Sequence, residues 1–204
     1  MSTIIEGLLE IKAVSLNFET PFTWASGIKS PIYCDNRKTL GHYELRHEIA
    51  LGLIKLIELN YPQVEVIGGT ATAGIPHATS IADSMKLPLV YFRSKAKDHG
   101  TQGKIEGDFK PGQKVVIVED LISTGGSVID SVRSAREAGM EVLGVVSIFN
   151  YQLKSAVENF SDENINWCSL LGFEELFHHL NLSDKHKVMI ESWRKNPYDN
   201  SIWD

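Results

Sequence analysis

The fold is decided by the stretch Val115-Val116-Ile117-Val118-Glu119-Asp120-Leu121-Ile122-Ser123-Thr124-Gly125-Gly126-Ser127. Its first four residues are β-branched and apolar, which is typical of a strand buried on both faces of a parallel sheet. Two carboxylates follow, and then a loop of hydroxyl residues and glycines leads into a helical run that ends before Gly139. Ligands of open α/β sheets bind beyond the carboxyl ends of the strands, so the stretch predicts a ligand site there.

The loop 123–127 has the composition of a phosphate-binding turn. Its backbone N–H groups can converge at the N-terminus of the following helix, and its hydroxyl side chains add further donors. The two glycines allow the backbone to approach a ligand closely. Glu119 and Asp120 repel phosphate, but they can accept hydrogen bonds from sugar hydroxyls. A ribose 5-phosphate would satisfy both halves of the stretch.

The alternative is an ordinary tight turn between a strand and a helix. A glycine-hydroxyl loop on its own favours that alternative, because short glycine motifs often occur by chance. The buried strand and the acidic pair together favour the ligand site. Two commoner phosphate motifs are excluded, because Gly126 is followed by Ser127 and Val128 rather than by Lys and Ser/Thr, and no G-x-G-x-x-G follows a strand.

The composition is that of an ordinary soluble globular protein. The 204 residues fit one domain, with 43% apolar and 23% charged residues. A net charge of −6 argues against general nucleic-acid binding. Cys34 and Cys168 are too few for a disulfide framework, and from the sequence we expect neither a signal peptide nor a membrane-spanning run. We expect a cytoplasmic protein with small-molecule partners, no nucleic acid and no membrane.

Two further segments are candidates for the same site. A strand at 64–67 opens into the glycine-rich loop 68–76, which can bind an anion or can equally be a simple turn. A strand at 87–92 leads into the long cationic loop 93–107. That loop is either a solvated face or a lid that closes over a polyanion and excludes water.

An N-terminal segment, 20–37, concentrates aromatic, hydroxyl and cationic side chains around two prolines and one glycine. The turn residues predict short strands rather than one long element. The mixture suits a cap over a flat anionic ring, although this segment alone favours a β-meander with a solvated face. The histidines lack ligand-spaced partners, so no metal site is predicted.

Residues 115–127 resemble the phosphoribosyl pyrophosphate signature of the type I phosphoribosyltransferases, and most closely that of the orotate phosphoribosyltransferases. The similarity extends from Phe22-Thr23-Trp24-Ala25-Ser26-Gly27 to about Tyr151, with the motifs in the same order. It implies a single α/β domain with a mostly parallel central sheet flanked by helices. It also implies a core at 41–170, a flexible catalytic loop, and a small hood subdomain formed by 15–40 with the C-terminal segment.

The resemblance further implies transfer of ribose 5-phosphate from phosphoribosyl pyrophosphate to orotate, giving orotidine 5′-monophosphate and pyrophosphate in pyrimidine (UMP) synthesis. Magnesium would arrive mainly on the phosphates of the donor, so few or no direct protein ligands to it are expected. Residues 96–100 match the family's mobile catalytic loop, which is shared between the subunits of a homodimer.

Three residues are expected to be catalytic: Lys97, His99 and Asp120. Ser123 is expected to bind orotate. The residues expected to bind phosphoribosyl pyrophosphate are Arg93, Lys97, His99, Glu119, Asp120, Leu121, Ile122, Ser123, Thr124, Gly125, Gly126 and Ser127.

Three positions depart from the family pattern. Many members carry lysine where this chain has Ala25 and a second loop lysine where it has Ser94, and some carry arginine where it has Tyr151. The contacts of those cations are missing here or are made by other groups. The alternatives are a phosphoribosyltransferase for another base, a non-catalytic regulator on the same fold, and a diphosphate-forming synthase. The acidic net charge and the Lys97/His99 pair argue against the regulator.

Overall fold

A six-stranded sheet forms the middle layer of this computed structural model, which describes residues 2–24, 26–94 and 103–203. The spatial order is β10, β9, β8, β5, β6 and β7, and all neighbours are parallel except β6 and β7. In that order the strands span Trp167–Gly172, Glu141–Asn150, Lys114–Ile122, Val66–Thr70, Leu89–Phe92 and Ile105–Glu106. The predicted α/β class with a mostly parallel sheet is confirmed.

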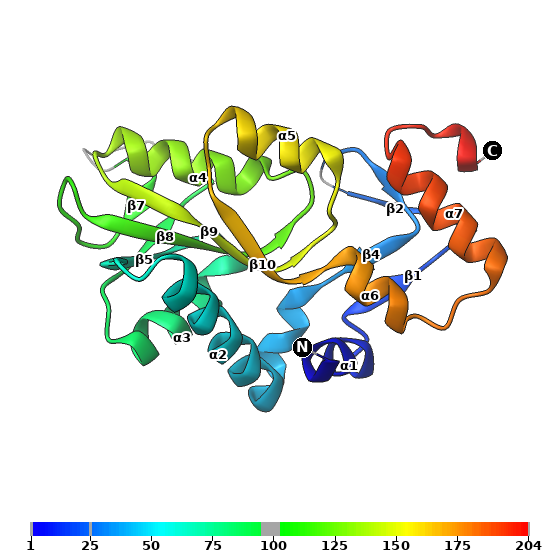
Figure 1. The fold of residues 1–204 in the computed structure, drawn as a ribbon, viewed down its shortest axis with the longest axis horizontal. Coiled ribbons are helices and arrows are strands. Elements are labelled where there is room, and N and C mark those ends of the chain that lie inside the picture. Colours follow the sequence, from blue (N-terminus) through cyan, green and yellow to red (C-terminus); the bar gives the residue numbers. More distant parts are fainter. Residues whose placement is uncertain (1, 25, 95–102, 204) are drawn as a thin grey trace.

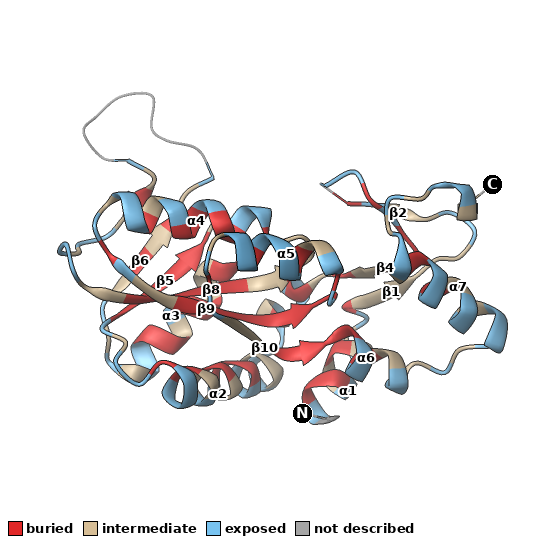
Figure 2. Ribbon diagram, turned by 45° about the horizontal axis from the view of Figure 1, so that its top comes forward, coloured by how far each residue is buried: buried red, intermediate tan, exposed pale blue. Residues whose placement is uncertain are grey.

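Helices cover both faces of this sheet (Figure 1). The helices α2 and α3 pack on one face, and α4 and α5 pack on the other. They span Tyr43–Asn60, Gly74–Met85, Gly126–Glu137 and Lys154–Asp162. Val116 and Val118 of β8 belong to the apolar cluster under α2 and α3, whereas Val115 and Ile117 belong to the cluster under α4 and α5. The apolar run is therefore buried on both sides, which is why it has no polar face (Figure 2).

The central strand β8 is longer than predicted, because it includes the acidic pair and the two residues after it. The reason lies in its neighbours. The ladder to β9 continues to Asn150, whereas the ladder to β5 ends at Gly69 and Val118. Glu119 and Asp120 therefore continue the sheet on one side only. Their other side borders the crevice between β5 and β8, the point at which the chain order of the strands reverses.

Two other boundaries also differ from the prediction. Residues 68–70 belong to β5 rather than to a loop, which leaves only 71–73 before α3. A side chain at Gly69 would collide with Ala78 of α3, so glycine allows the helix to pack directly on the strand. The segment predicted as loop 93–107 contains the short strand β7, whose Glu106 pairs with Tyr91. A strand of two residues is too short to show an alternation of apolar and polar residues in the sequence.

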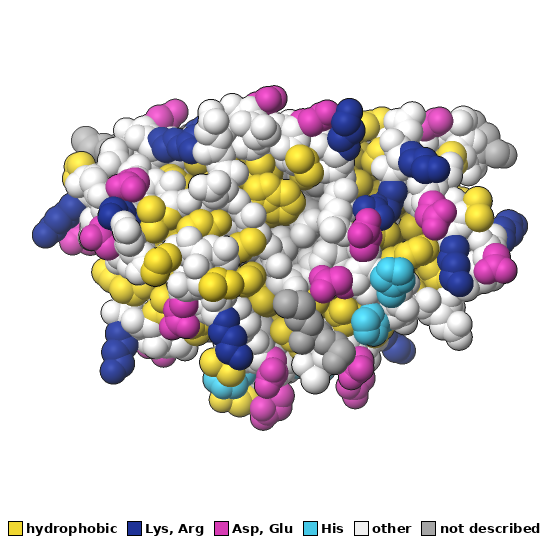
Figure 3. Space-filling view, in the orientation of Figure 1, with side chains coloured by type: hydrophobic (Ala, Val, Ile, Leu, Met, Phe, Trp, Pro, Cys, Tyr) yellow, Lys and Arg dark blue, Asp and Glu magenta, His cyan; other side chains and the backbone are white. Residues whose placement is uncertain are grey.

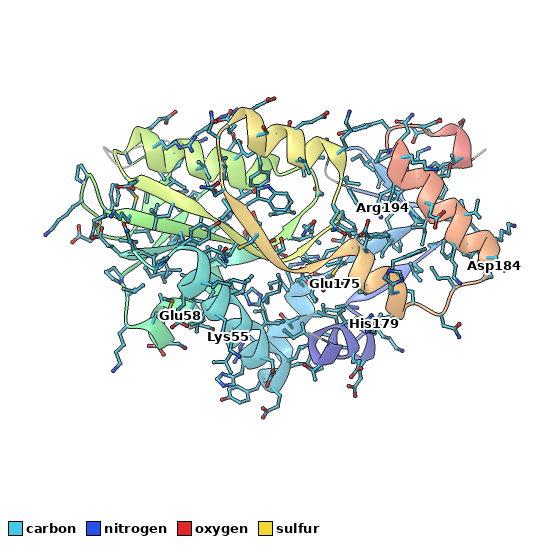
Figure 4. All side chains as sticks on the ribbon, in the orientation of Figure 1. Lys55, Glu58, Glu175, His179, Asp184 and Arg194 are labelled. Atoms are coloured by element: carbon cyan, nitrogen blue, oxygen red, sulfur yellow. The ribbon has the colours of Figure 1, made fainter. Side chains whose placement is uncertain are left out.

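The N- and C-terminal segments pack together beside the sheet (Figure 1). Strand β1 pairs with β4, and β2 pairs with β3, both antiparallel. The indole N–H of Trp193 donates to the carbonyl oxygen of Lys29 (2.8 Å). The guanidinium carbon of Arg194, a residue of α7 that is labelled in Figure 4, lies over the ring of Phe173, 4.7 Å from its centre. The elements are α1 (Ser2–Glu10), β1 (Val14–Leu16), β2 (Phe22–Thr23), β3 (Lys29–Ser30), β4 (Ile32–Cys34), η1 (Asn36–Gly41), α6 (Phe173–His179), α7 (Asp184–Lys195) and η2 (Ser201–Trp203).

The outer surface is mixed in charge. On the face drawn in Figure 3, Lys and Arg side chains are interspersed with Asp and Glu side chains. None of the helices in the described ranges is both long enough and apolar enough to cross a membrane.

Candidate active site

A cleft of about 310 Å³ opens at the carboxyl ends of β5 and β8. Three parts of the chain line it: the turn 71–73 after β5, the end of β8 with the start of α4, and the N-terminal strands with Tyr151. The peptide bond between Ala71 and Thr72 is cis. The cleft lies at the crevice in which an open α/β sheet binds its ligands.

The acidic pair lies in this cleft. Glu119 is buried, with 6% of its surface exposed, and Asp120 is half-buried. The backbone N–H of Asp120 donates to Glu119 Oε1 (3.0 Å). Burial raises the pKa of Glu119 well above its usual value, and the neighbouring Asp120 charge raises it further. Burial also raises the pKa of Asp120, although hydrogen bonds and the Arg37 charge oppose the rise. The pair therefore holds a proton more readily than two exposed carboxylates would.

The predicted phosphate loop connects β8 to α4. Gly125 has a φ of 84°, in the left-handed region, and the ring of Phe160 packs where a Cβ would stand. The carbonyl oxygen of Thr124 accepts a hydrogen bond from Asn159 Nδ2 (2.9 Å), which ties the loop to α5. Ser123 and Ser127 line the cleft. The first N–H groups of a helix have no partner within the helix, so α4 presents donors suited to an anion here.

The two residues between the acidic pair and the loop have different surroundings. Leu121 lines the cleft, whereas the side chain of Ile122 is buried in the core beneath α4 and α5. The carbonyl oxygen of Ile122 accepts a hydrogen bond from the backbone N–H of Tyr151 (3.0 Å). Ile122 thus connects the end of β8 to the segment after β9 through its backbone.

A second, smaller pocket of about 200 Å³ adjoins the cleft and shares Ala71 and Ser127 with it. Arg93 lines this pocket, and its Nη1 lies 3.4 Å from Glu106 Oε1 of β7. The fold therefore brings Arg93 next to the phosphate loop although about 30 residues separate them in sequence. The other two loop residues expected at the site, Lys97 and His99, lie outside the described residues, as does position 25.

The N-terminal wall of the cleft contains residues that the sequence identified only as a group. Trp24 and Tyr151 lie face against face at a tilt of 37°, with ring centres 4.2 Å apart. The hydroxyl oxygen of Tyr151 accepts a hydrogen bond from the backbone N–H of Cys34 (2.9 Å). Arg37 and Asp35 complete the wall. For Trp24, Asp35 and Arg37 the sequence signal was the composition of 20–37, whereas Tyr151 was noted as a departure from the family pattern.

The arrangement can hold a sugar phosphate beside a flat ring. The acidic pair, residues at the start of α4 and an aromatic wall line one cleft, and Arg93 lines the adjoining pocket. In the ranges that the structure describes, no group of three or more His, Cys, Asp or Glu side chains could hold a metal ion.

Comparison with known proteins identifies the family of this chain. A family model described as phosphoribosyl transferase domain matches residues 47–171, so the chain belongs to the phosphoribosyltransferase family. An orotate phosphoribosyltransferase from Enterococcus faecalis is 50% identical over 198 residues, which cover 95% of this chain and 94% of the relative. One from Streptococcus pneumoniae is 56% identical over 175 residues, which cover 86% and 83%. These relatives place the chain among the orotate phosphoribosyltransferases.

Solved structures agree with this assignment. The orotate phosphoribosyltransferase of Aeropyrum pernix is 26% identical, with a TM-score of 0.77 over 86% of this chain and 97% of that chain. The UMP synthase of Leishmania donovani is 25% identical, with a TM-score of 0.80 over 95% of this chain and 42% of that chain.

Proposed function

We propose that the cleft transfers the ribose 5-phosphate group of phosphoribosyl pyrophosphate to a ring nitrogen of orotate, giving orotidine 5′-monophosphate and pyrophosphate. The observation that carries the proposal is the cleft itself. It combines the acidic pair of β8, the N-terminus of α4 and an aromatic wall within about 310 Å³. A sugar phosphate and a flat pyrimidine need these three features together.

The donor is positioned by the two halves of the β8–α4 stretch. The acidic pair, Glu119 and Asp120, accepts hydrogen bonds from the ribose hydroxyls, and Leu121 and Ile122 carry the pair on the rigid end of β8. The 5-phosphate binds at the helix N-terminus. Its ligands are Ser123, Thr124, Gly125, Gly126 and Ser127. The diphosphate then extends toward the turn 71–73 and Arg93, and Ser123 also contacts orotate.

The chemistry requires positioning and charge stabilisation rather than a covalent nucleophile. The bond from the anomeric carbon to the pyrophosphate oxygen breaks, a bond to the orotate nitrogen forms, and that nitrogen gives up its proton. Positive charge develops on the sugar ring, as in glycoside hydrolysis. Asp120 stabilises it through its negative potential, while Lys97, His99 and Arg93 neutralise the departing pyrophosphate.

Magnesium would enter with the donor. The cleft offers the carboxylates of Glu119 and Asp120, whose pKa values are raised by burial, and this pair alone makes a poor cage for a divalent cation. Mg²⁺ would therefore be held mainly by the phosphate oxygens and by water. When bound, it offsets the negative charge of the diphosphate.

We also propose that the functional unit is a cytoplasmic homodimer. In this unit the hood (15–40 with the C-terminal segment) covers orotate, and the core (41–170) holds the donor. The catalytic loop with Lys97 and His99 reaches the site of the neighbouring subunit.

The test is loss of orotate absorbance after addition of phosphoribosyl pyrophosphate and magnesium. We expect turnover with orotate and none with hypoxanthine or adenine. Asp120→Asn should lower kcat or weaken donor binding while leaving the circular dichroism spectrum unchanged. Consumption of a purine, or wild-type kinetics in the Asp120 variant, would contradict the proposal. Donor binding without any turnover would support a regulator instead.

A further inference from the structure

The residues that line the cleft carry more negative than positive charge, and the proposed substrate is itself negatively charged. Among the lining residues in the described ranges, three are carboxylates and Arg37 is the single cation. Orotate itself carries a carboxylate. The family cations expected at positions 25 and 151 are absent, since these positions hold Ala and Tyr. A negatively charged ring needs a positive partner in such a cleft, because an uncompensated charge is costly to desolvate.

The guanidinium of Arg37 has protein partners for some of its N–H donors and leaves the others available to a ligand. Its Nε lies 2.6 Å from Asp35 Oδ1, and its Nη2 donates to the hydroxyl oxygen of Tyr33 (3.3 Å). Nη1 has no hydrogen-bond partner among the residues that the structure describes. The side chain is 60% exposed although Asp35 anchors it, so a ligand in the cleft can reach the remaining N–H donors.

The backbone that carries Arg37 is fixed to the acidic strand. Asn36, the preceding residue, is fully buried, and its Nδ2 donates to the carbonyl oxygen of Asp120 (2.7 Å). The hydroxyl of Thr39 donates to the carbonyl oxygen of Asn36 (2.6 Å), which holds the first turn of η1. Arg37 thereby has a defined position relative to the ribose-binding carboxylates. Such preorganisation lowers the entropy cost of binding a second substrate beside the first.

A guanidinium suits a carboxylate better than an ammonium does. Its planar array of N–H donors can bind both oxygens of a carboxylate at once. The nearby rings of Trp24 and Tyr151 give the cleft an apolar wall for the flat part of the substrate. The ring and its charged substituent therefore have separate partners.

We propose that Arg37, oriented by Asp35 and Tyr33, binds the carboxylate of the pyrimidine substrate and makes the enzyme select orotate over uracil. This inference rests on the proposed function and goes beyond it, because it assigns base selectivity to a residue outside the phosphoribosyl pyrophosphate signature. Arg37 touches the substrate but not the reacting atoms. Its loss should therefore affect orotate binding far more than donor binding.

The test compares Arg37→Gln and Arg37→Lys with Lys38→Gln. Lys38→Gln is a matched control, because it removes the same charge one residue away. Lys38 does not line the cleft, and its Nζ donates to the carbonyl oxygen of Lys12. Steady-state kinetics would measure KM for orotate and for phosphoribosyl pyrophosphate. Uracil, which lacks the carboxylate, would serve as a second acceptor or, where its turnover is too slow, as an inhibitor competing with orotate.

For Arg37→Gln we expect KM for orotate to rise roughly 10- to 100-fold, the loss typical of a hydrogen bond between charged groups. KM for the donor and the affinity for uracil should stay within about twofold, since a neutral ring lacks the contact. Arg37→Lys should give an intermediate rise, and Lys38→Gln should behave as wild type.

Two results would overturn the inference. One is an unchanged KM for orotate in both Arg37 variants. The other is an equal loss for orotate, uracil and donor, which would indicate a purely structural role. A wild-type protein that fails to consume orotate would instead contradict the proposed function, so the two failures are distinguishable.

Discussion

At the residue scale, Glu119 combines a proposed role in ribose binding with a cost in stability. Its carboxyl is buried beside Asp120, and burial raises its pKa well above the usual value. The folded state therefore prefers the protonated form. As the pH rises above the ordinary pKa of an exposed glutamate, the folded protein must ionise a buried group or keep a proton that the unfolded chain releases. Stability falls with rising pH until the raised pKa is passed.

Glu119→Gln should consequently stabilise the protein and impair it. The amide oxygen can still accept the N–H of Asp120, but no charge needs to be buried. We expect a gain of about 0.5–2 kcal/mol in the free energy of unfolding at pH 8, the range of common single stabilising replacements. The gain should shrink toward pH 4, because the wild-type carboxyl of Glu119 is then protonated and as neutral as the amide that replaces it. Urea unfolding at the two pH values measures it, together with KM for the donor. A variant less stable than wild type at pH 8 would contradict this account.

Gly125 is the residue of the phosphate loop that accepts no side chain. Its left-handed φ costs other residues about 1–2 kcal/mol, and Phe160 occupies the place of a Cβ. Gly125→Ala should therefore lower the free energy of unfolding by at least that amount and raise KM for phosphoribosyl pyrophosphate. Gly126→Ala is the matched control for the free energy of unfolding alone, because the space around Gly126 is open. An equal loss of unfolding free energy in the two variants would contradict a special role for the left-handed conformation of Gly125.

At the element scale, one hydrogen bond joins the N-terminal wall to the acidic strand. Asn36 of η1 donates to the carbonyl oxygen of Asp120, which belongs to the half of β8 that has no partner on the β5 side. A second bond, from the Trp193 indole to Lys29, joins α7 to β3. The wall is thus held between the core sheet and the C-terminal helix, although neither contact is local in sequence.

Asn36→Ala should loosen this connection. The buried carbonyl of Asp120 loses its donor, so we expect a loss of about 1–3 kcal/mol in the free energy of unfolding. Because Arg37 follows directly, KM for orotate should rise more than KM for the donor. Asn60→Ala removes a comparable bond to the carbonyl of Leu56, at an exposed site away from the cleft, and should change neither KM. If KM for orotate in Asn36→Ala equals that of the wild type, the position of the N-terminal wall does not control orotate binding.

At the scale of the whole molecule, the shared catalytic loop can be tested by mixing two inactive subunits. Lys97→Ala should lower kcat by roughly 10²-fold or more through lost charge stabilisation of the leaving group. Asp120→Asn disables the other half of the site. If the loop of one subunit serves its neighbour, a mixed dimer contains one intact site. Coexpression in equal amounts should then restore about a quarter of wild-type activity, because half of the dimers are mixed and half of their sites are intact.

No recovery above the separate variants would mean that each subunit uses its own loop. Sedimentation of the mixture provides the control, since the dimer has to be present for either outcome to be informative. Lys97 lies in a part of the chain that the structure does not describe, so this experiment tests its role by measuring activity.

The sequence by itself determined the class of fold, and it predicted the phosphate loop and the chemistry of the site. A run of four β-branched residues, an acidic pair and a glycine-hydroxyl turn are local features, and each has a direct physical meaning within a few residues. The ends of the strands could not be predicted as well from the sequence. The extension of β8 through Glu119 and Asp120 depends on pairing with β9, and the end of β5 depends on where α3 packs.

Only the tertiary structure decided which residues of the N-terminal segment reach the cleft. Arg37 lines the same cleft as the acidic pair. The residue before it, Asn36, is hydrogen-bonded to β8, and Trp193 is hydrogen-bonded to Lys29 of β3, contacts that span 84 and 164 residues. Periodicity and local propensity carry no information about partners so distant, because these contacts form only when separate segments pack on one core.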